Sequence, residues 1–232
     1  MKINLLVCDW FEGTLPEFLT SFPELFYNLF DSVSVTPSTY QLYDVQKGEL
    51  PDKLETNELY LISGSRAGAY EQDGWIDNLR HFIRRAHRLQ IKMVGICFGH
   101  QLIAQALGGK VELSPKGWGA GIRSSKVVLP RAEAYFTGGE MRLFYNHNDQ
   151  VVQLPAEAER IATSDFCENE GFVVGRHILC FQGHPEYTAA FAQHLLDSAH
   201  DVSPEVLKRA HDSILRDDAM GREAARWMMN LG

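Results

Sequence analysis

The stretch KMVGICFGHQ (residues 92–101) joins a short apolar run to a cysteine that has a glycine two positions away on each side. Residues 92–96 have the length and the apolar character of a buried strand. After Cys97, apolar residues recur with helical spacing from Leu102 to Leu107, and two glycines follow. The sequence therefore predicts a sharp turn at Cys97, between a buried strand and a helix.

A cysteine at such a turn is typical of a nucleophile. The string Gly-x-Cys-x-Gly has the layout of a nucleophile elbow, in which a strained turn exposes the reactive atom. Gly95 and Gly99 let neighbouring backbone pass close to the turn, because they have no Cβ. The start of a helix also favours a thiolate, and its free N–H groups can stabilise an oxyanion. The alternative is a buried, inert thiol, which is the commoner kind of free cysteine.

A second string, QGHPEY (residues 182–187), offers a base for this nucleophile. Pro185 restricts His184 to extended geometry, and side chains two positions apart in an extended chain face the same way. His184 and Glu186 are therefore expected side by side, as a general base and the carboxylate that orients it. A turn with a surface glutamate is the alternative interpretation.

The order of the expected elements indicates an α/β fold, because strands alternate with helices in the first half of the chain. Thr14 is a candidate N-cap for the first helix. We expect strands at 2–8, 40–45, 59–62, 92–96, 122–129, 141–145, 160–163, 172–175 and 178–182, and helices at 18–29, 75–86, 102–107 and after 188. No repeat or linker divides the chain, so we expect a single domain over residues 1–232, with 188–232 as a helical segment packed on it.

The composition argues against several classes of protein. The 232 residues include 22 Lys and Arg against 30 Asp and Glu, a formal net charge of −8, which disfavours nucleic acid or an anionic membrane as a partner. The four cysteines form no CxxC pair, so no metal site is expected. The N-terminal apolar run is too short for a signal peptide, and no apolar segment is long enough to span a bilayer. We expect a soluble, cytoplasmic protein.

The strings GICFGHQ (95–101) and GHPE (183–186) together resemble the class I glutamine amidotransferase family, whose Cys-His-Glu triad hydrolyses glutamine to glutamate and ammonia. LISGS (61–65) and NHND (146–149) resemble the family's oxyanion loop and glutamine-binding segment. The resemblance covers most of residues 1–190 and is closest to the glutaminase domain of GMP synthase and to stand-alone γ-glutamyl peptidases. It implies a flavodoxin-like fold: a mostly parallel central sheet with helices on both faces and the nucleophile elbow after a central strand.

The resemblance also implies a role for each catalytic residue. Cys97 would attack the γ-carboxamide carbon of the substrate. His184 would take the thiol proton and then protonate the departing ammonia, while Glu186 orients the His184 ring. The N–H groups of Gly64 and Phe98 would hold the oxyanion.

On the substrate side, the same resemblance implies that Gln101, Asn148 and Asp149 bind the amino-acid end. The substrate would be glutamine or a γ-glutamyl compound, hydrolysed through a γ-glutamyl thioester without a cofactor or a metal. If the enzyme passes the released ammonia on, a separate synthetase subunit would be its partner. Nucleic acid and membranes are not expected as partners.

Several alternatives stay open at this point. The family's loop usually has a proline where this chain has Arg66, which is either an added carboxylate contact or a solvated surface residue. Residues 116–119 (KGWG) are either a plain loop or a gate near the site. The function is that of a glutamine amidotransferase-like hydrolase, of a γ-glutamyl peptidase without an ammonia acceptor, or of a catalytically silent regulatory protein with the same fold. An α/β-hydrolase is least favoured, because its acid precedes the histidine in the chain.

Overall fold

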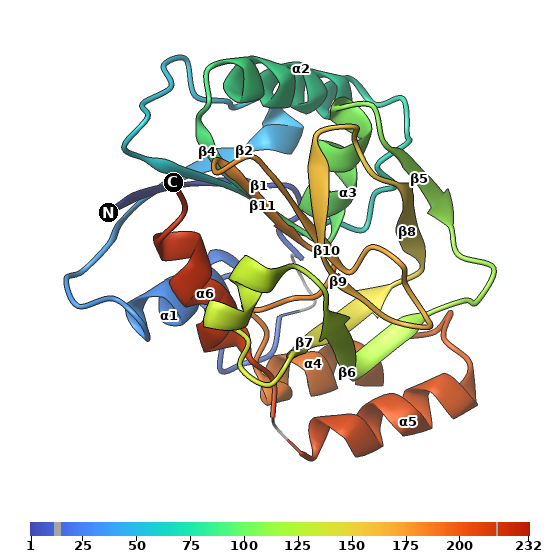
Figure 1. Ribbon diagram of the computed structural model, residues 1–232. Helices are drawn as coiled ribbons and strands as arrows, with labels where there is room; N and C mark the ends of the chain where they lie inside the picture. The colour runs from blue at the N-terminus through green and yellow to red at the C-terminus, as the bar shows by residue number, and fades with distance from the viewer. Residues whose placement is uncertain (12–14, 217) are drawn as a thin grey trace.

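A nine-stranded mixed sheet forms the centre of the molecule (Figure 1). The computed structural model describes residues 1–11, 15–216 and 218–232. The strands of this sheet are β1 (Lys2–Val7), β2 (Thr39–Asp44), β3 (Leu59–Ile62), β4 (Lys92–Ile96), β6 (Gly119–Val127), β7 (Glu140–His147), β9 (Ala158–Thr163), β10 (Gly171–Val174) and β11 (Ile178–Phe181). Their order is β2-β1-β3-β4-β11-β10-β9-β6-β7, in which the first five are parallel and the later neighbours antiparallel.

Helices cover both faces of this sheet (Figure 1). They are α1 (Pro23–Asp31), α2 (Gly74–Arg88), α3 (Phe98–Ala106), α4 (Ala189–Asp197), α5 (Pro204–Ile214) and α6 (Gly221–Met229). Alternate strand residues point to opposite faces. Leu6 and Met93 pack with the apolar residues of α2 and α3, whereas Leu5 and Val94 pack with those of α1 and α6. The predicted fold class, a mostly parallel sheet with helices on both faces, is confirmed.

The first helix differs from its prediction. α1 begins at Pro23, and residues 15–22 form turns whose apolar side chains Leu19 and Phe22 are nevertheless buried. Proline fits the first turn of a helix, because the N–H that it lacks has no partner there, so Pro23 starts the helix instead of kinking it. The expected cap, Thr14, lies outside the described residues.

A separate antiparallel ribbon of β5 (Lys110–Leu113) and β8 (Asp149–Gln153) was not predicted. In β5 only Val111 is buried, so the strand has no run of alternating apolar residues to reveal it. The ribbon matters for the site because β8 follows β7 directly and begins at Asp149.

The parallel half of the sheet gathers the candidate residues at one edge. β4 lies between β3 and β11 and is parallel to both, so the carboxyl ends of these three strands are adjacent. Cys97 follows β4, His184 comes shortly after β11, and Gly64 comes shortly after β3. Ligands of open α/β sheets bind in the crevice at this edge. None of the helices in the described ranges is both long and apolar enough to cross a membrane.

Candidate active site

Cys97 sits on a strained turn between β4 and α3. Its backbone has φ 51° and ψ −101°, a region that L-residues rarely adopt and that is associated with about 1–3 kcal/mol of strain. A Cβ at Gly99 would lie 2.3 Å from the Ile62 carbonyl oxygen, and one at Gly95 would lie 2.7 Å from the backbone of Gly99. Both flanking positions therefore require glycine, and the turn has the geometry of a nucleophile elbow.

His184 and Glu186 lie side by side in the segment after β11. The His184 Nδ1 is 2.7 Å from a Glu186 carboxylate oxygen, and both side chains are buried. The His184 ring stacks on Tyr187 with the ring centroids 3.9 Å apart, and the His184 N–H donates to the Phe144 carbonyl at 2.7 Å. Contacts on the ring and on the backbone thus hold the imidazole in one orientation.

The His184 ring lies near Cys97 as well as against Glu186, because both His184 and Cys97 border Gly64 and line one cavity. Burial alone would lower the pKa of His184, but the negative charges of Glu186 and Cys97 outweigh it and raise the pKa to about 10. The imidazolium is therefore the favoured form at neutral pH, placed between a carboxylate and a sulfur atom.

Gly64 and Phe98, the residues expected to supply the oxyanion N–H groups, lie next to Cys97. A Cβ at Gly64 would lie 3.0 Å from Cε1 of His184 and 3.7 Å from the Cβ of Cys97, so Gly64 touches both side chains. Phe98 is the first residue of α3, where N–H groups have no partner within the helix. Within residues 1–11, 15–216 and 218–232, neither the Gly64 N–H nor the Phe98 N–H donates a backbone hydrogen bond. Both remain available to a ligand oxygen.

A cavity of about 100 Å³ opens at Cys97. Its lining comprises Phe11, Ser65, Arg66, Ala67, Cys97, Gln101, Trp118, Asn146, His147, Asn148, Asp149, His184 and Tyr187. The three residues expected to bind substrate, Gln101, Asn148 and Asp149, all line it. In the described part of the chain, no group of three or more His, Cys, Asp or Glu residues is arranged to hold a metal ion.

The polar ends of two of these residues also have partners within the protein. The Gln101 side-chain amide donates to the Asp149 carbonyl at 2.9 Å and to the Gln182 side-chain oxygen at 3.2 Å, so it ties α3 to the start of β8. The Asp149 carboxylate accepts from the Tyr70 hydroxyl at 3.2 Å, and burial raises its pKa. Gln101 therefore shapes the cavity wall, and the half-buried Asp149 also lines it.

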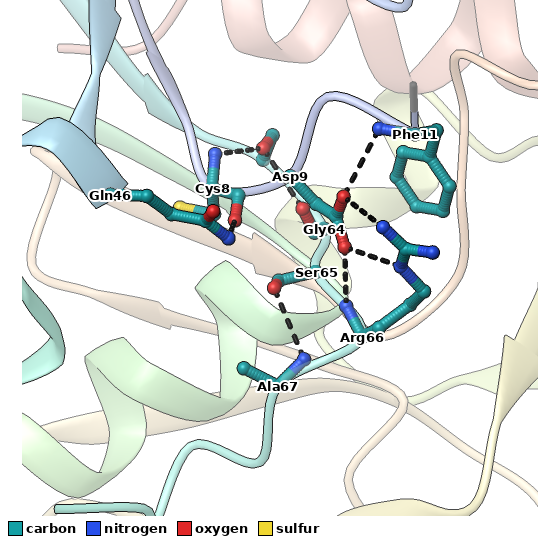
Figure 2. A network of polar contacts seen from close by, with 9 residues as sticks. Cys8, Asp9, Phe11, Gln46, Gly64, Ser65, Arg66 and Ala67 are labelled. Carbon is teal, nitrogen blue, oxygen red and sulfur yellow. Dashed lines mark hydrogen bonds and ion pairs between the residues drawn. The ribbon is translucent and has the colours of Figure 1, made fainter. Parts of the chain in front are cut away.

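Sequence reasoning missed Asp9 and Tyr187, and it considered Trp118 only as part of the 116–119 loop. Asp9 directly follows the β1 region, and it binds Arg66 in the loop after β3 (Figure 2). Its position at the carboxyl edge of a parallel strand was the signal that could have found it. Trp118, in the 116–119 loop, lines the cavity. A gating role for this loop stays a prediction.

Comparisons with known proteins show which family the chain is similar to. A family model described as "Glutamine amidotransferase class-I" matches residues 17–198. The chain is 37% identical over 183 residues to gamma-glutamyl peptidase 2 of Arabidopsis thaliana, covering 75% of this chain and 74% of that protein. It is 35% identical over 111 residues to a glutamine-hydrolyzing GMP synthase subunit of Methanospirillum hungatei, covering 46% of this chain and 57% of that subunit.

A solved structure has the same fold. The crystal structure of a glutamine amidotransferase from Thermotoga maritima matches with a TM-score of 0.74 at 21% identity, covering 98% of this chain and 96% of that one. The relatives confirm the prediction of an enzyme of the glutamine amidotransferase and γ-glutamyl hydrolase type. Together with the family model, they show that the chain belongs to the class I glutamine amidotransferase family.

Proposed function

We propose that this protein hydrolyses the γ-amide bond of glutamine or of a γ-glutamyl compound, with Cys97 as the nucleophile. The observation that carries the proposal is the position of His184, whose ring contacts Glu186 at 2.7 Å and lines the same cavity as Cys97. A nucleophile, a base and a residue that orients the base are the parts that covalent hydrolysis requires. Family membership supports the same reaction.

In the first half of the reaction the thiol proton resides on His184, whose pKa of about 10 favours the imidazolium. The Cys97 thiolate attacks the γ-carbonyl carbon, and the electrons of the C=O double bond move to the oxygen. The N–H groups of Gly64 and Phe98 stabilise the resulting oxyanion. The tetrahedral intermediate collapses as His184 gives its proton to the departing nitrogen, so the C–N bond breaks and a γ-glutamyl thioester remains.

In the second half, water hydrolyses the thioester. The His184 ring, now neutral, accepts a proton from the water molecule as its oxygen attacks the thioester carbon. Collapse of this second intermediate breaks the C–S bond, releases glutamate and restores the pair of Cys97 thiolate and His184 imidazolium. Glu186 keeps its contact with Nδ1 throughout and stabilises the charged ring each time it forms.

The direction of the substrate follows from the proton donor. Because His184 protonates the leaving nitrogen, the leaving group lies on the side of the cavity that His184 and Tyr187 line. The glutamyl end then lies against the wall of Gln101, Asn148 and Asp149.

The comparisons favour a γ-glutamyl peptide over free glutamine as substrate. The match to gamma-glutamyl peptidase 2 spans 74% of that protein, whereas the match to the GMP synthase subunit spans 57% of its length. A glutaminase that passes ammonia to a separate synthetase is the second candidate, favoured by the similarity to the GMP synthase subunit itself.

The experiment is a substrate panel of glutamine and several γ-glutamyl dipeptides, with released glutamate as the readout. We expect glutamate from dipeptides with the wild-type protein, and none above background with Cys97→Ala. The control variant is Cys167→Ala, which changes a buried cysteine outside the cavity and should stay active. Equal turnover by wild type and Cys97→Ala, or no turnover of any substrate in the panel, would contradict the proposal.

A further inference from the structure

A buried carboxylate connects the segment after β1 to the loop after β3. Asp9 is 5% exposed, and Arg66 contacts it with a two-pronged ion pair: Nε lies 2.8 Å from Oδ2 and Nη2 lies 2.8 Å from Oδ1 (Figure 2). The backbone N–H of Arg66 donates to the same Oδ2 at 3.2 Å. Paired, planar contacts of this kind are stronger and geometrically more specific than single ones.

The carboxylate also holds its own segment. The Phe11 N–H donates to Oδ1 of Asp9 at 3.1 Å, and the Phe11 backbone is held at φ 53°. Asp9 thus accepts four hydrogen bonds, one from Phe11 and three from Arg66, which uses the full accepting capacity of a carboxylate. Burial would raise the pKa of Asp9, but these hydrogen bonds outweigh it and keep the pKa below its ordinary value.

The loop that Asp9 holds contains a candidate oxyanion donor. Gly64 lies two residues before Arg66 and touches both Cys97 and His184. On the other side of Gly64, the Ser63 hydroxyl accepts from the Cys8 N–H at 2.9 Å and donates to the Gly64 carbonyl at 3.0 Å. The segment after β1 therefore contacts the loop on both sides of Gly64.

We propose that Asp9 and Arg66 are positioning residues for the reaction: their ion pair fixes the 63–67 loop so that Gly64 stays next to Cys97 and His184, where its N–H meets the oxyanion. The inference rests on the proposed function. It also accounts for an arginine where the loops that this chain resembles usually have a proline. A proline stiffens a loop because its ring fixes the backbone angle φ. Here the contact of Arg66 with Asp9, in the segment after β1, restricts the 63–67 loop instead.

Arg66 has a competing candidate role, because its side chain is 65% exposed and it lines the cavity. An arginine that binds a substrate carboxylate would act on KM, and Asp9 would then matter little. A positioning pair acts on kcat instead, because the oxyanion exists only in the transition state and the intermediates. The four contacts to Asp9 favour the positioning role.

The test compares Asp9→Asn, Arg66→Gln and the double variant by steady-state kinetics on the best γ-glutamyl dipeptide. Asparagine has the shape of aspartate, but its NH2 group cannot accept the bonds that Arg66 and Phe11 donate. Each single variant should lower kcat about 10- to 100-fold, a fraction of the loss typical when an oxyanion donor is removed. KM should change less than about threefold, and the double variant should be no slower than the slower single variant, because both remove one contact.

Controls separate this proposal from loss of folding and from failure of the proposed function. Glu159→Gln breaks the ion pair between Arg131 and Glu159, which lies outside the cavity, and should leave kcat unchanged. Arg66→Lys keeps the charge but loses the two-pronged contact, so a folded variant should have an intermediate kcat. Alkylation of Cys97 by iodoacetamide should proceed at the wild-type rate in every folded variant, since that reaction needs no oxyanion.

The outcomes are distinct. No turnover by the wild type would defeat the proposed function itself. Wild-type turnover with an unchanged kcat in Asp9→Asn would overturn the positioning role, and so would a raised KM confined to the Arg66 variants. Additive losses in the double variant would show that the two residues act separately, which would also overturn it.

Discussion

The imidazole of His184 and the carboxylate of Glu186 are in contact at 2.7 Å. Both side chains are buried, and only one residue separates them in the chain. The expected extended geometry is not what brings them together: His184 forms an isolated antiparallel bridge with Phe144, and Pro185 and Glu186 then form a turn. A buried imidazole next to a buried carboxylate keeps its proton to a higher pH than a free one.

Removing the Glu186 charge should change both the rate and its pH dependence. In Glu186→Gln, the pKa of His184 should fall from about 10, because the largest effect that opposes burial is removed and only Cys97 still opposes it. We expect kcat to fall about 10⁴-fold, by analogy with the replacement of the orienting carboxylate by its amide in a Ser-His-Asp triad. The alkaline limit of the pH–rate profile should move to lower pH. An alkaline limit at the same pH in both proteins would contradict the assignment.

Stability should depend on the same proton. The folded-state pKa of His184, about 10, is raised above its ordinary value of 6.5, so its stabilising contribution is fully present below about pH 6.5 and is lost as pH rises toward 10. Urea unfolding midpoints should therefore decline between pH 7 and 10 in the wild type. In His184→Ala this part of the decline should be absent. Parallel profiles for the two proteins would count against a protonated His184 in the folded state.

The two glycines that flank Cys97 should tolerate no side chain. A Cβ at Gly99 would lie 2.3 Å from the Ile62 carbonyl oxygen, so Gly99→Ala must displace α3 or β3. We expect a loss of about 1–3 kcal/mol of unfolding free energy, as for other overpacked cores, together with loss of turnover. Gly74→Ala is the matched control, because a Cβ at Gly74 meets nothing within 4 Å. A fully active Gly99→Ala protein would show that the elbow geometry is wrong.

The Asp149 carboxylate should act on substrate binding. If it accepts hydrogen bonds from the α-ammonium group of the glutamyl residue, Asp149→Asn should raise KM about 10-fold, since a charge-assisted hydrogen bond contributes about 1.5–3 kcal/mol. The kcat value should change little. Tyr70→Phe removes only the hydroxyl that contacts Asp149 from the outer side, so it serves as the control. A lower kcat with an unchanged KM in Asp149→Asn would exclude this role.

The parts of the site that could be predicted from the sequence are those set by local spacing. The elbow at Cys97 was predictable because its flanking glycines mark a close backbone approach, and the pairing of His184 with Glu186 because the two residues are only two positions apart. Strands β3 and β4 were also predicted, because each is a short, continuous apolar run, which is a local signal of a buried strand. The exposed ribbon of β5 and β8 has no such pattern and was missed.

The contact of Asp9 with Arg66 could not be predicted in this way. These residues are 57 positions apart, and they meet because β1 and β3 are neighbours in the sheet. Strand order is a property of tertiary packing, which local propensity does not contain. From the sequence, Arg66 was either an added carboxylate contact or a solvated surface residue. In the structure its side chain is largely exposed to solvent and also pairs with the carboxylate of Asp9.

The most direct test of Cys97 as the attacking atom is mass spectrometry of the protein after brief exposure to an electrophilic γ-glutamyl analogue. The proposed mechanism predicts a single γ-glutamyl adduct on the peptide that contains Cys97, formed much more slowly in His184→Ala and absent in Cys97→Ala. An adduct on Cys8, Cys167 or Cys180 instead, or substrate turnover that persists in Cys97→Ala, would contradict it.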